Sequence, residues 1–400
     1  MGKKKLPLTY DNLGVSSQKE DVHKAIKDVD KGLFPSAFCK VIPDVLTGDG
    51  EKCLIFHADS AGTKTIIAYL HWRETGDARV FRGIAQDALV MNIDDIACAG
   101  LASGFVISNT IERNKFLITG DVIKEIIAGY QDVVDVMAPF GIALHLCGGE
   151  TADVGDLIRT VTAECTVMAR GHRASIIETV NAVPGDCIVG LSNTGKATYE
   201  TAPNSSIGSN GITMARHAIL AHDYAVKYPE IVDPSVKDAY LGKFHLQDKL
   251  PGGSTTIGTA LLSPTRTYLP VLHALFTSFG SPKDLKERIH AIIHDTGGGQ
   301  TKCMKFGSGV RYVKDDLFPV PEIFELIQQE GNVSWEEMYR VFNMGHRLEL
   351  VCTKDYAEEA INTAKHFGIE AKVIGHVERN PGSSGNAVVI KTQAGTFTYA

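Results

Sequence analysis

Residues 118–150, ITGDVIKEIIAGYQDVVDVMAPFGIALHLCGGE, carry the strongest fold signal in the chain. Apolar residues recur at spacings of three and four in the first part, which predicts an amphipathic helix. Pro139, Phe140 and Gly141 close that helix, because proline cannot continue it and glycine accepts the conformation that commonly follows a helix end. The apolar run after Gly141 predicts a buried strand that ends in a glycine turn near residue 150. A helix leading directly into a buried strand is typical of α/β architecture.

Composition narrows the class of protein. At 400 residues the chain is long enough for two or three domains. A hydrophobic share of 44% and a charged share of 22% are ordinary for a soluble globular protein. The net charge of −7 does not favour binding to the negatively charged backbone of a nucleic acid, so no nucleic-acid partner is expected. With no apolar run long enough for a membrane span and no signal-peptide core, we expect a cytoplasmic protein without a membrane partner.

The eight cysteines are spread singly and form no C-x-x-C pair. This spacing predicts neither a zinc site nor a disulfide framework. Most of the thiols are then expected to be small buried side chains in a reducing compartment.

Strand and helix signals alternate on both sides of the opening stretch. We place a domain boundary near 171–184, which gives an amino-terminal domain of residues 1–175 and a carboxy-terminal domain of residues 176–400. The polar stretch 221–256 is expected to be an insertion in the second domain. Strands are predicted at 157–171 and 183–193, and helices at 263–280 (with Ser263 as its cap), 332–345 (with a Ser334–Glu337 capping box) and 355–368.

Two stretches come close to a phosphate-binding P-loop without being one. HADSAGTKT (57–65) lacks the required first glycine and has Thr63 between Gly62 and the lysine. GLSNTGKA (190–197) has the glycine spacing but ends in alanine, where the motif needs a hydroxyl group for Mg²⁺. It also runs into a loop-like segment and not into a helix, so a strand ending in a turn is the better interpretation.

Four short segments place acidic residues or a histidine beside small residues after an apolar run. They are DSAGTK (59–64), NIDDIACAG (92–100), GGETAD (148–153) and HDTGGG (294–299). Turns at strand ends expose backbone N–H groups that bind anions, at the sheet edge where ligands usually lie. Their carboxylates suit Mg²⁺ bridging to phosphates, and Lys64 would supply positive charge. Taken singly, each of these residues is more often a turn former, a cap or a surface charge.

The order of these segments and the residues in them resemble the motifs of the aminoimidazole ribonucleotide synthetase family, formally phosphoribosylformylglycinamidine cyclo-ligase. The resemblance extends over nearly the whole chain. It includes LTYDNLGV (8–15), SPTRTYLPVL (263–272) and GNVSWEEMYRVFNMG (331–345), and the last of these is the specific one, because sibling families do not share it in this form. It implies an α/β amino-terminal domain whose sheet pairs with its twin across a homodimer. It also implies a carboxy-terminal domain with a ferredoxin-like α+β core.

The resemblance also implies the reaction, a step of de novo purine biosynthesis. ATP activates the formyl amide oxygen of formylglycinamidine ribonucleotide, an intramolecular nitrogen displaces phosphate, and the imidazole ring closes. Such chemistry needs charge stabilisation and a folded substrate more than a strong base. The implied cofactors are ATP and Mg²⁺, with K⁺ as a further candidate.

The family's functional residues are carried over to matching positions only. The implied catalytic residues are His294, Lys64 and Asp59, and the implied metal ligands are Asp59, Asp95 and Glu150. The implied nucleotide contacts are Asp59, Thr63, Lys64, Asp94, Asp95, Glu150 and Thr151. The implied substrate contacts are Ser209, Asn210, Gly211, Thr296, Gly297, Gly298 and Gly299.

Several positions depart from the family's pattern. The region before DSAGTK, residues 34–48, contains no glycine-rich loop. Gly208 stands where the family has the histidine of H-S-N-G, and His346 and Arg347 stand where it has small residues. Two alternatives therefore stay open. One is an ATP-dependent small-molecule kinase or ligase of the same superfamily with another substrate, and the other is a catalytically silent nucleotide-binding homologue.

Overall fold

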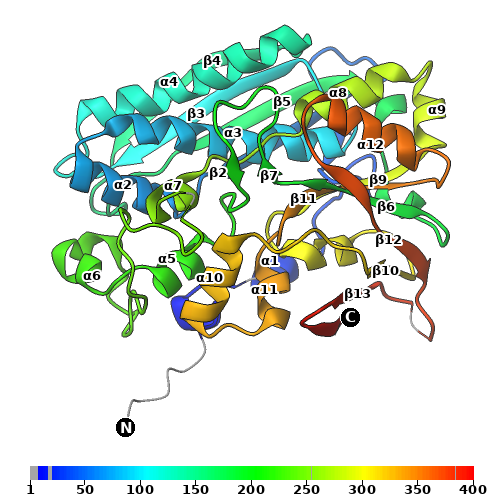
Figure 1. The fold of residues 1–400 in the computed structure, drawn as a ribbon. Coiled ribbons are helices and arrows are strands. Elements are labelled where there is room, and N and C mark those ends of the chain that lie inside the picture. Colours follow the sequence, from blue (N-terminus) through cyan, green and yellow to red (C-terminus); the bar gives the residue numbers. More distant parts are fainter. Residues whose placement is uncertain (1–7, 17–19, 254, 383) are drawn as a thin grey trace.

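The computed structural model describes residues 8–16, 20–253, 255–382 and 384–400 (Figure 1). Its strands are β1 Val41–Pro43, β2 Lys52–Ser60, β3 Phe105–Arg113, β4 Leu144–Asp153, β5 Glu164–His172, β6 Cys187–Ser192, β7 Thr194–Gly195, β8 Asn204–Ser205, β9 Ile289–His294, β10 Val310–Lys314, β11 His346–Cys352, β12 Ala371–Arg379, β13 Ala387–Thr392 and β14 Gly395–Tyr399. Its α-helices are α1 Glu20–Ala25, α2 Lys64–Thr75, α3 Phe81–Cys98, α4 Gly120–Met137, α5 Ile212–Ile219, α6 Asp223–Lys227, α7 Ile257–Leu262, α8 Leu269–Ser278, α9 Pro282–Lys286, α10 Glu322–Gly331, α11 Trp335–Val341 and α12 Ala357–His366. The 3₁₀ helices are η1 Asp11–Leu13, η2 Ala78–Val80, η3 Ala138–Phe140, η4 Arg173–Ser175, η5 Thr179–Asn181, η6 Pro229–Ile231 and η7 Gly299–Lys305.

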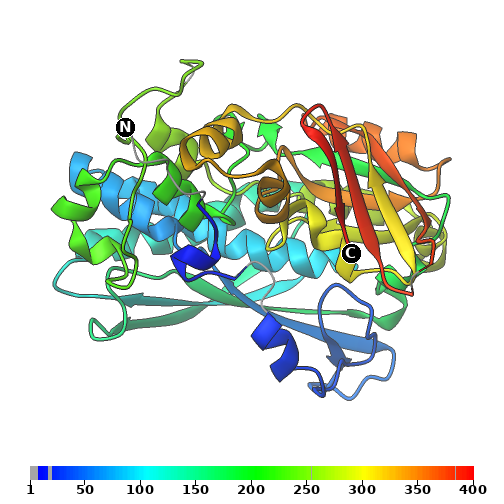
Figure 2. The same cartoon turned by 90° about the horizontal axis from the view of Figure 1, so that it is seen from below.

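The first sheet has one covered face and one open face. Its strand order is β1-β2-β5-β3-β4, with β3 and β4 parallel and the other pairs antiparallel. Helix α4 is the crossover that parallel neighbours require, and together with α3 it covers one face (Figure 2). Ile55 and Val167 are fully buried beneath these helices, whereas Phe56 on the other face is 61% exposed. The alternation of β2 therefore separates a core face from a face open to solvent.

The second sheet is built around an antiparallel β-α-β-β-α-β unit. Its full order is β14-β13-β10-β12-β6-β11-β9. Strands β6, β9, β11 and β12 pair antiparallel in the order β12-β6-β11-β9. Helix α8 leads to β9, α12 leads from β11 to β12, and the two helices contact each other. This is the strand order of a ferredoxin-like unit, and β11 is buried along its whole length.

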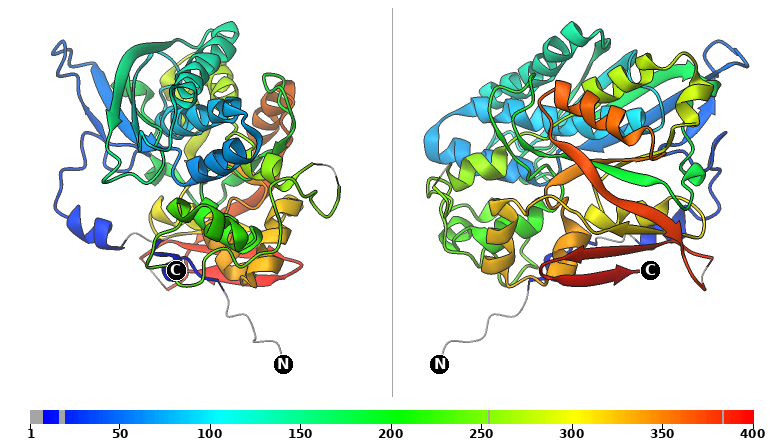
Figure 3. Two further views of the ribbon diagram at one scale, coloured as in Figure 1. Left: turned by 90° about the vertical axis from the view of Figure 1, so that its left-hand side faces the viewer. Right: turned by 45° about the vertical axis from the view of Figure 1, so that its right-hand side comes forward.

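Helix α3 joins the two halves of the chain. It packs against β2 and β5 of the first sheet and against β9 and α8 of the second half. Figure 3 shows the two halves, blue to cyan and yellow to red, packed against each other. Asp87, Asp94 and Asp95 of this helix are all buried. Since buried carboxylates need partners, α3 is where polar contacts between the two halves are expected.

Several predicted elements are confirmed. The helix of the opening stretch is α4, and Gly141 follows η3 in the left-handed conformation with φ +73°. The strand after it is β4, but the prediction of a buried strand that ends in a glycine turn is wrong, because only Leu144 of β4 is buried and the strand continues through Gly148 and Gly149 to Asp153 on the open edge of the sheet. Ser334 caps α11 as predicted, because its hydroxyl accepts from Glu337 N at 3.2 Å. Residues 190–197 form a strand end and a turn with no helix after them. Among the described residues no helix is both long and apolar enough to cross a membrane.

The helix predicted at 263–280 is wrong in its first turn and a half. Residues 263–268 form no helix or strand, and α8 begins only at Leu269. The reason is tertiary. Asp87 binds the backbone N–H of Thr265 and Asp94 binds that of Tyr268, so α3 fixes these residues before the helix starts.

Candidate active site between the two domains

The turn after β2 brings two helix N-termini together. Ala61, Gly62 and Thr63 connect β2 to α2, and Gly62 has φ +57°. Thr63 Oγ1 lies 2.8 Å from Thr213 Oγ1 in the first turn of α5. Neither helix has an acidic residue in its first turn. Unpaired N–H groups at helix N-termini favour anions, so this junction suits a phosphate group.

Lys64 does not lie where a phosphate ligand was expected. Its ammonium group is fully buried and donates to Asp87 Oδ1 at 3.0 Å and to the Ser263 carbonyl at 2.6 Å. Asp87 Oδ1 also accepts from the N–H and the hydroxyl of Thr265. Lys64 therefore links α2, α3 and the 263–265 segment, because its side chain points into the interior and away from the turn.

Asp94 also has a structural place. Its two oxygens accept from Thr267 Oγ1 at 2.5 Å and from Tyr268 N at 2.8 Å, just before α8 begins. Burial raises the pKa of this carboxyl group to about 7, although both hydrogen bonds oppose the shift. The nucleotide contact implied for Asp94 is not supported by this geometry, because both of its oxygens are occupied in the interior.

Asp95, the next residue, faces the opposite way. Its Oδ1 lies 2.7 Å from His294 Nδ1 on β9, and its Oδ2 lies 3.6 Å from His57 Nε2 on β2. Burial alone would raise the pKa of Asp95, but Lys302 and the His294 hydrogen bond outweigh it and lower that pKa to about 2. Asp95 is thus a permanent carboxylate at a point where both halves of the chain meet.

His294 has no ring nitrogen left for proton transfer in this structure. Its Nδ1 is bound to Asp95, and its Nε2 lies 3.0 Å from Arg347 Nε. Because arginine can only donate, His294 Nε2 must accept and the proton must sit on Nδ1. Burial, and next to it the charge of Arg347, lowers the pKa of His294 to about 4 although Asp95 opposes this. The proton-carrier role implied for His294 is therefore replaced by that of a bridge between Asp95 and Arg347.

Glu150 is remote from Asp59 within one chain. Strand pairing places Glu150 opposite Thr110, Thr110 opposite Glu164, and Glu164 opposite Ser60. Three strand spacings of about 4.8 Å separate the ends of this row by about 14 Å. Thr151 lies beside Glu150 on the same exposed stretch of β4.

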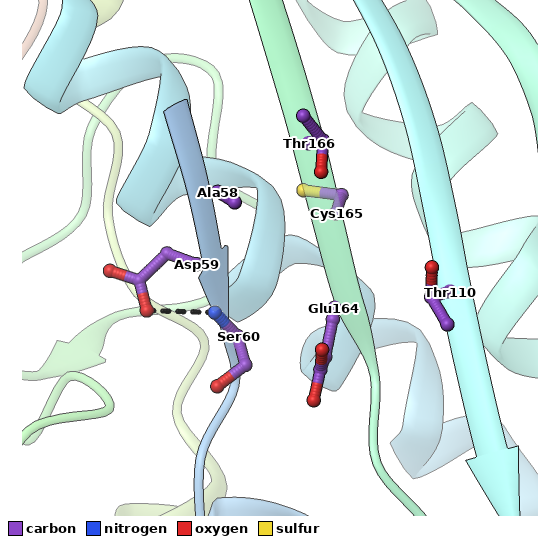
Figure 4. Close-up of a pocket in the computed structure, with 7 residues that line it drawn as sticks. All are labelled: Ala58, Asp59, Ser60, Thr110, Glu164, Cys165 and Thr166. Atoms are coloured by element: carbon purple, nitrogen blue, oxygen red, sulfur yellow. Dashed lines mark hydrogen bonds between the residues drawn. The ribbon is translucent and has the colours of Figure 1, made fainter. Parts of the chain in front are cut away.

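A polar hollow of about 210 Å³ lies over this row on the open face of the first sheet (Figure 4). Ser60, Glu164 and Thr110 line it, and Asp59 stands at its edge with its Oδ1 accepting from Ser60 N at 2.8 Å. Burial, followed by the neighbouring charges of Glu112 and Asp59, raises the pKa of Glu164. Glu164 is the carboxylate beside Ser60 and Thr110 in this hollow, whereas the Asp59 side chain points away from Glu164 (Figure 4).

The implied metal ligands do not form a ready-made group in one chain. Asp59, Asp95 and Glu150 come from three elements, and Glu150 is separated from the others by the sheet. In the part of the chain that the structure describes, the acidic and histidine groups close enough to share an ion are instead Asp295, His346 and Glu349. Lys314 already pairs with Glu349 there, and burial, with Glu349 beside it, raises the pKa of Asp295. A protonated Asp295 leaves that cluster electrically neutral without a metal.

The two glycine-containing loops meet beside Asp95 and His294. Ser209 and Asn210 are half-buried just before α5, and Thr296 lies two residues after the end of β9, with its hydroxyl bound by Lys302. Gly299 has φ +49°, and a Cβ there would lie 2.5 Å from the Phe342 carbonyl oxygen. Gly299 therefore lets the loop pack closely against the segment before β11. Of the implied substrate residues, Asn210 is connected to Asp95 by a chain of hydrogen bonds that runs through Arg347 and His294.

Four residues of this region were missed from the sequence. Asp87 was hidden in the middle of an apolar helix, and Glu164 in an alternating strand. Lys302 follows the H-D-T-G-G-G segment and lies 4.6 Å from the ring centre of Phe38. Arg347 was noticed only as a departure from a family pattern. A buried charge in an otherwise apolar stretch is the signal that could have drawn attention to Asp87 and Arg347.

Comparison with known proteins identifies the family. Residues 39–170 match the family described as AIR synthase related protein, N-terminal domain, and residues 183–387 match AIR synthase related protein, C-terminal domain. The chain belongs to this family of ATP-using enzymes.

Individual relatives carry a more specific name. The phosphoribosylformylglycinamidine cyclo-ligase of Methanococcus maripaludis strain C7 is 28% identical over 93% of this chain and 93% of its own length. The protein of the same name from Methanocaldococcus jannaschii is 29% identical over 86% of this chain and 83% of its own length.

Solved structures share the fold at much lower identity. A chain of the HypE–HypF complex has a TM-score of 0.54 and 15% identity, covering 95% of this chain and 98% of that one. AaThiL complexed with AMPPCP and TMP has a TM-score of 0.52 and 11% identity, covering 96% of each chain. At these identities the likeness shows the two-domain fold alone.

Proposed function

We propose that this protein is a phosphoribosylformylglycinamidine cyclo-ligase. In the proposed reaction the formyl amide oxygen of formylglycinamidine ribonucleotide attacks the γ-phosphorus of ATP and ADP leaves. The amidine-side nitrogen then attacks the activated carbon, the C–O bond breaks, and phosphate departs as the imidazole ring closes. Mg²⁺ would neutralise charge on the transferring phosphoryl group.

The observation that carries the proposal is the meeting of the expected nucleotide side with the expected substrate side. Asp95 of the first half binds His294 of the second half at 2.7 Å, and Thr63 binds Thr213 at 2.8 Å. The junction thus combines a carboxylate for a cation with helix N-termini for a phosphate. Relatives bearing the cyclo-ligase name align over nearly the whole chain, which supports the same assignment.

The residues of the chain fit a cation site that two protomers complete. Asp59 and Asp95 would contribute carboxylates from one protomer. Glu150 is exposed and about 14 Å away along the sheet, so it can serve a twin whose open face packs on this one. We propose a homodimer in which the open faces of the first sheets pair, placing Glu150 of each protomer at the site of the other. Lys302 takes the place of Lys64 as the proposed phosphate-side cation.

The test is product formation by the purified protein. Incubation with formylglycinamidine ribonucleotide, ATP, Mg²⁺ and K⁺ should yield aminoimidazole ribonucleotide and ADP in equal amounts. The Lys196→Ala variant, which alters the P-loop-like turn, should retain turnover within about twofold. ATP consumption without this product would indicate another superfamily member with a different substrate. A large loss in Lys196→Ala would return attention to residues 190–197.

A further inference from the structure

Arg347 is a buried arginine that touches both halves of the candidate site. It lies on β11 with none of its surface exposed. Its Nε donates to His294 Nε2 at 3.0 Å, and its Nη2 donates to Asn210 Oδ1 at 3.0 Å and contacts Met91 Sδ at 3.2 Å. Burying a guanidinium group is costly unless its donors are paired. A charge held at this point therefore needs an explanation beyond packing.

The loop at 208–211 is shaped around this side chain. Gly208 has φ +63°, and a Cβ on it would lie 1.8 Å from Arg347 Nη1. Nη1 itself is buried and has no hydrogen-bond partner among the described residues. The guanidinium group therefore occupies the space that any side chain at position 208 would need.

We propose that Arg347 is a positioning residue that sets the orientation of the Asn210 side-chain amide for the ribonucleotide. The inference rests on the proposed function for the identity of the ligand. The guanidinium group of Arg347 is held by its hydrogen bond to His294, which fixes the guanidinium plane independently of the loop at 208–211.

The orientation follows from donor and acceptor chemistry. Because Arg347 can only donate, the atom of Asn210 that it meets must be the amide oxygen. The Asn210 NH₂ group must then point away from Arg347, and Asn210 is half-exposed. Two N–H donors are thereby directed away from Arg347, where a carbonyl, hydroxyl or phosphate oxygen of the ribonucleotide would accept.

The first test is kinetic. Arg347→Met removes the donors at similar length and should raise KM for formylglycinamidine ribonucleotide about 10-fold or more, the effect expected for one charge-assisted hydrogen bond. KM for ATP should change by less than about threefold. Asn210→Ala should raise the same KM. The variant with both Arg347→Met and Asn210→Ala should have a ribonucleotide KM no higher than that of the more impaired single variant. Arg347→Lys should restore part of the loss. Multiplying effects in the double variant would overturn the proposal.

Two further variants guard against simple misfolding. Gly208→Ala should displace the guanidinium group from the other side and raise the ribonucleotide KM, with no further increase when Arg347 is already methionine. Arg216→Met is the matched control, because this buried arginine bonds to the Ile231 carbonyl and to the Tyr240 hydroxyl. Its ribonucleotide KM should stay within about twofold of wild type, and a rise equal to that of Arg347→Met would contradict a positioning role.

Hydrogen exchange separates failure of this inference from failure of the proposed function. The backbone amides of residues 208–211 should exchange faster in Arg347→Met than in Arg216→Met, whatever the substrate is. Absent cyclo-ligase activity in the wild type would refute the proposed function and leave this measurement decisive. Unchanged exchange at 208–211 would refute the positioning role even in an active enzyme.

Discussion

Two faces of helix α3 use the same residue type in opposite ways. On one face, Asp87 and Asp94 accept hydrogen bonds from residues 265–268, which fixes that segment before α8 begins. On the other, Asp95 reaches His294 and approaches His57, where the two domains meet near the exposed end of β2. Asp94 and Asp95 are consecutive in sequence, so their roles are decided by what faces each one. The difference separates carboxylates that hold the domains together from a carboxylate available for chemistry.

The largest expected effect is on stability, at the first face. Asp87→Ala leaves the Lys64 ammonium group buried without its ion-pair partner, and we expect a loss of about 3–5 kcal/mol in the free energy of unfolding. Combined replacement by Lys64→Met and Asp87→Leu should recover part of that loss, because no buried charge remains. Urea unfolding of the wild type and of these two variants measures both changes. An Asp87→Ala variant as stable as wild type would show that the Lys64–Asp87 pair does not hold the domains together.

The next effect is on turnover and separates the two neighbouring residues. Asp95→Asn keeps the shape of the side chain but removes the charge, so turnover should fall by about 100-fold or more while the fold is retained. Asp94→Asn is the matched control and should keep turnover within about fivefold. Steady-state kinetics measures the turnover of both variants, and circular dichroism checks that both retain the fold. Equal losses of turnover would erase the distinction between the two faces.

A third prediction concerns residues brought to one site by two chains. Asp59→Ala and Glu150→Ala should each abolish turnover. Mixing the two inactive proteins under conditions that allow subunit exchange should restore about a quarter of wild-type activity, because half of the dimers would carry one intact site of two. Activity is followed after mixing and after a mock exchange of each variant alone. No recovery, with exchange demonstrated by mass, would place Glu150 outside the partner's site.

The smallest effect, taken over a single pH unit, is a pH dependence of stability at the first face. The pKa of Asp94 is raised to about 7 in the folded chain from 3.8 when unfolded, so the folded state binds the proton more tightly. Its contribution to stability is then present at low pH and is lost as pH rises from about 4 to about 7, by at most about 1.4 kcal/mol per pH unit. Denaturant titrations should show this slope in wild type and not in Asp94→Asn. Parallel curves would mean that Asp94 is ionised throughout.

Local patterns were predicted well from the sequence, whereas partners across the domain junction were not. The α4–β4 unit, the Ser334 cap and the turn at 190–197 follow from short-range rules, and the structure has them. The start of α8 depends on Asp87 and Asp94, which lie more than 150 positions away from residues 263–268. The direction of the Lys64 side chain depends on Asp87 and on the distant Ser263 carbonyl. No spacing rule within one segment contains that information.

The same limit applied to the candidate site. Of the four glycine-and-carboxylate segments, NIDDIACAG and HDTGGG are brought into contact through Asp95 and His294. That Glu150 lies three strands away from Ser60, and that Arg347 fills the space beside Gly208, could be seen only once the strands and loops were placed. The residue types suggested phosphate and cation chemistry, whereas the contacts that each residue makes depend on the pairing of elements distant in sequence.

The measurement that tests the central claim most directly follows one oxygen atom. Formylglycinamidine ribonucleotide labelled with ¹⁸O in its formyl amide group would be turned over with ATP, and the inorganic phosphate would be analysed by mass spectrometry. The account predicts one ¹⁸O in each phosphate released, because the formyl oxygen is phosphorylated and leaves with the phosphoryl group. Unlabelled phosphate formed together with ADP would contradict activation of the formyl oxygen and with it the proposed function.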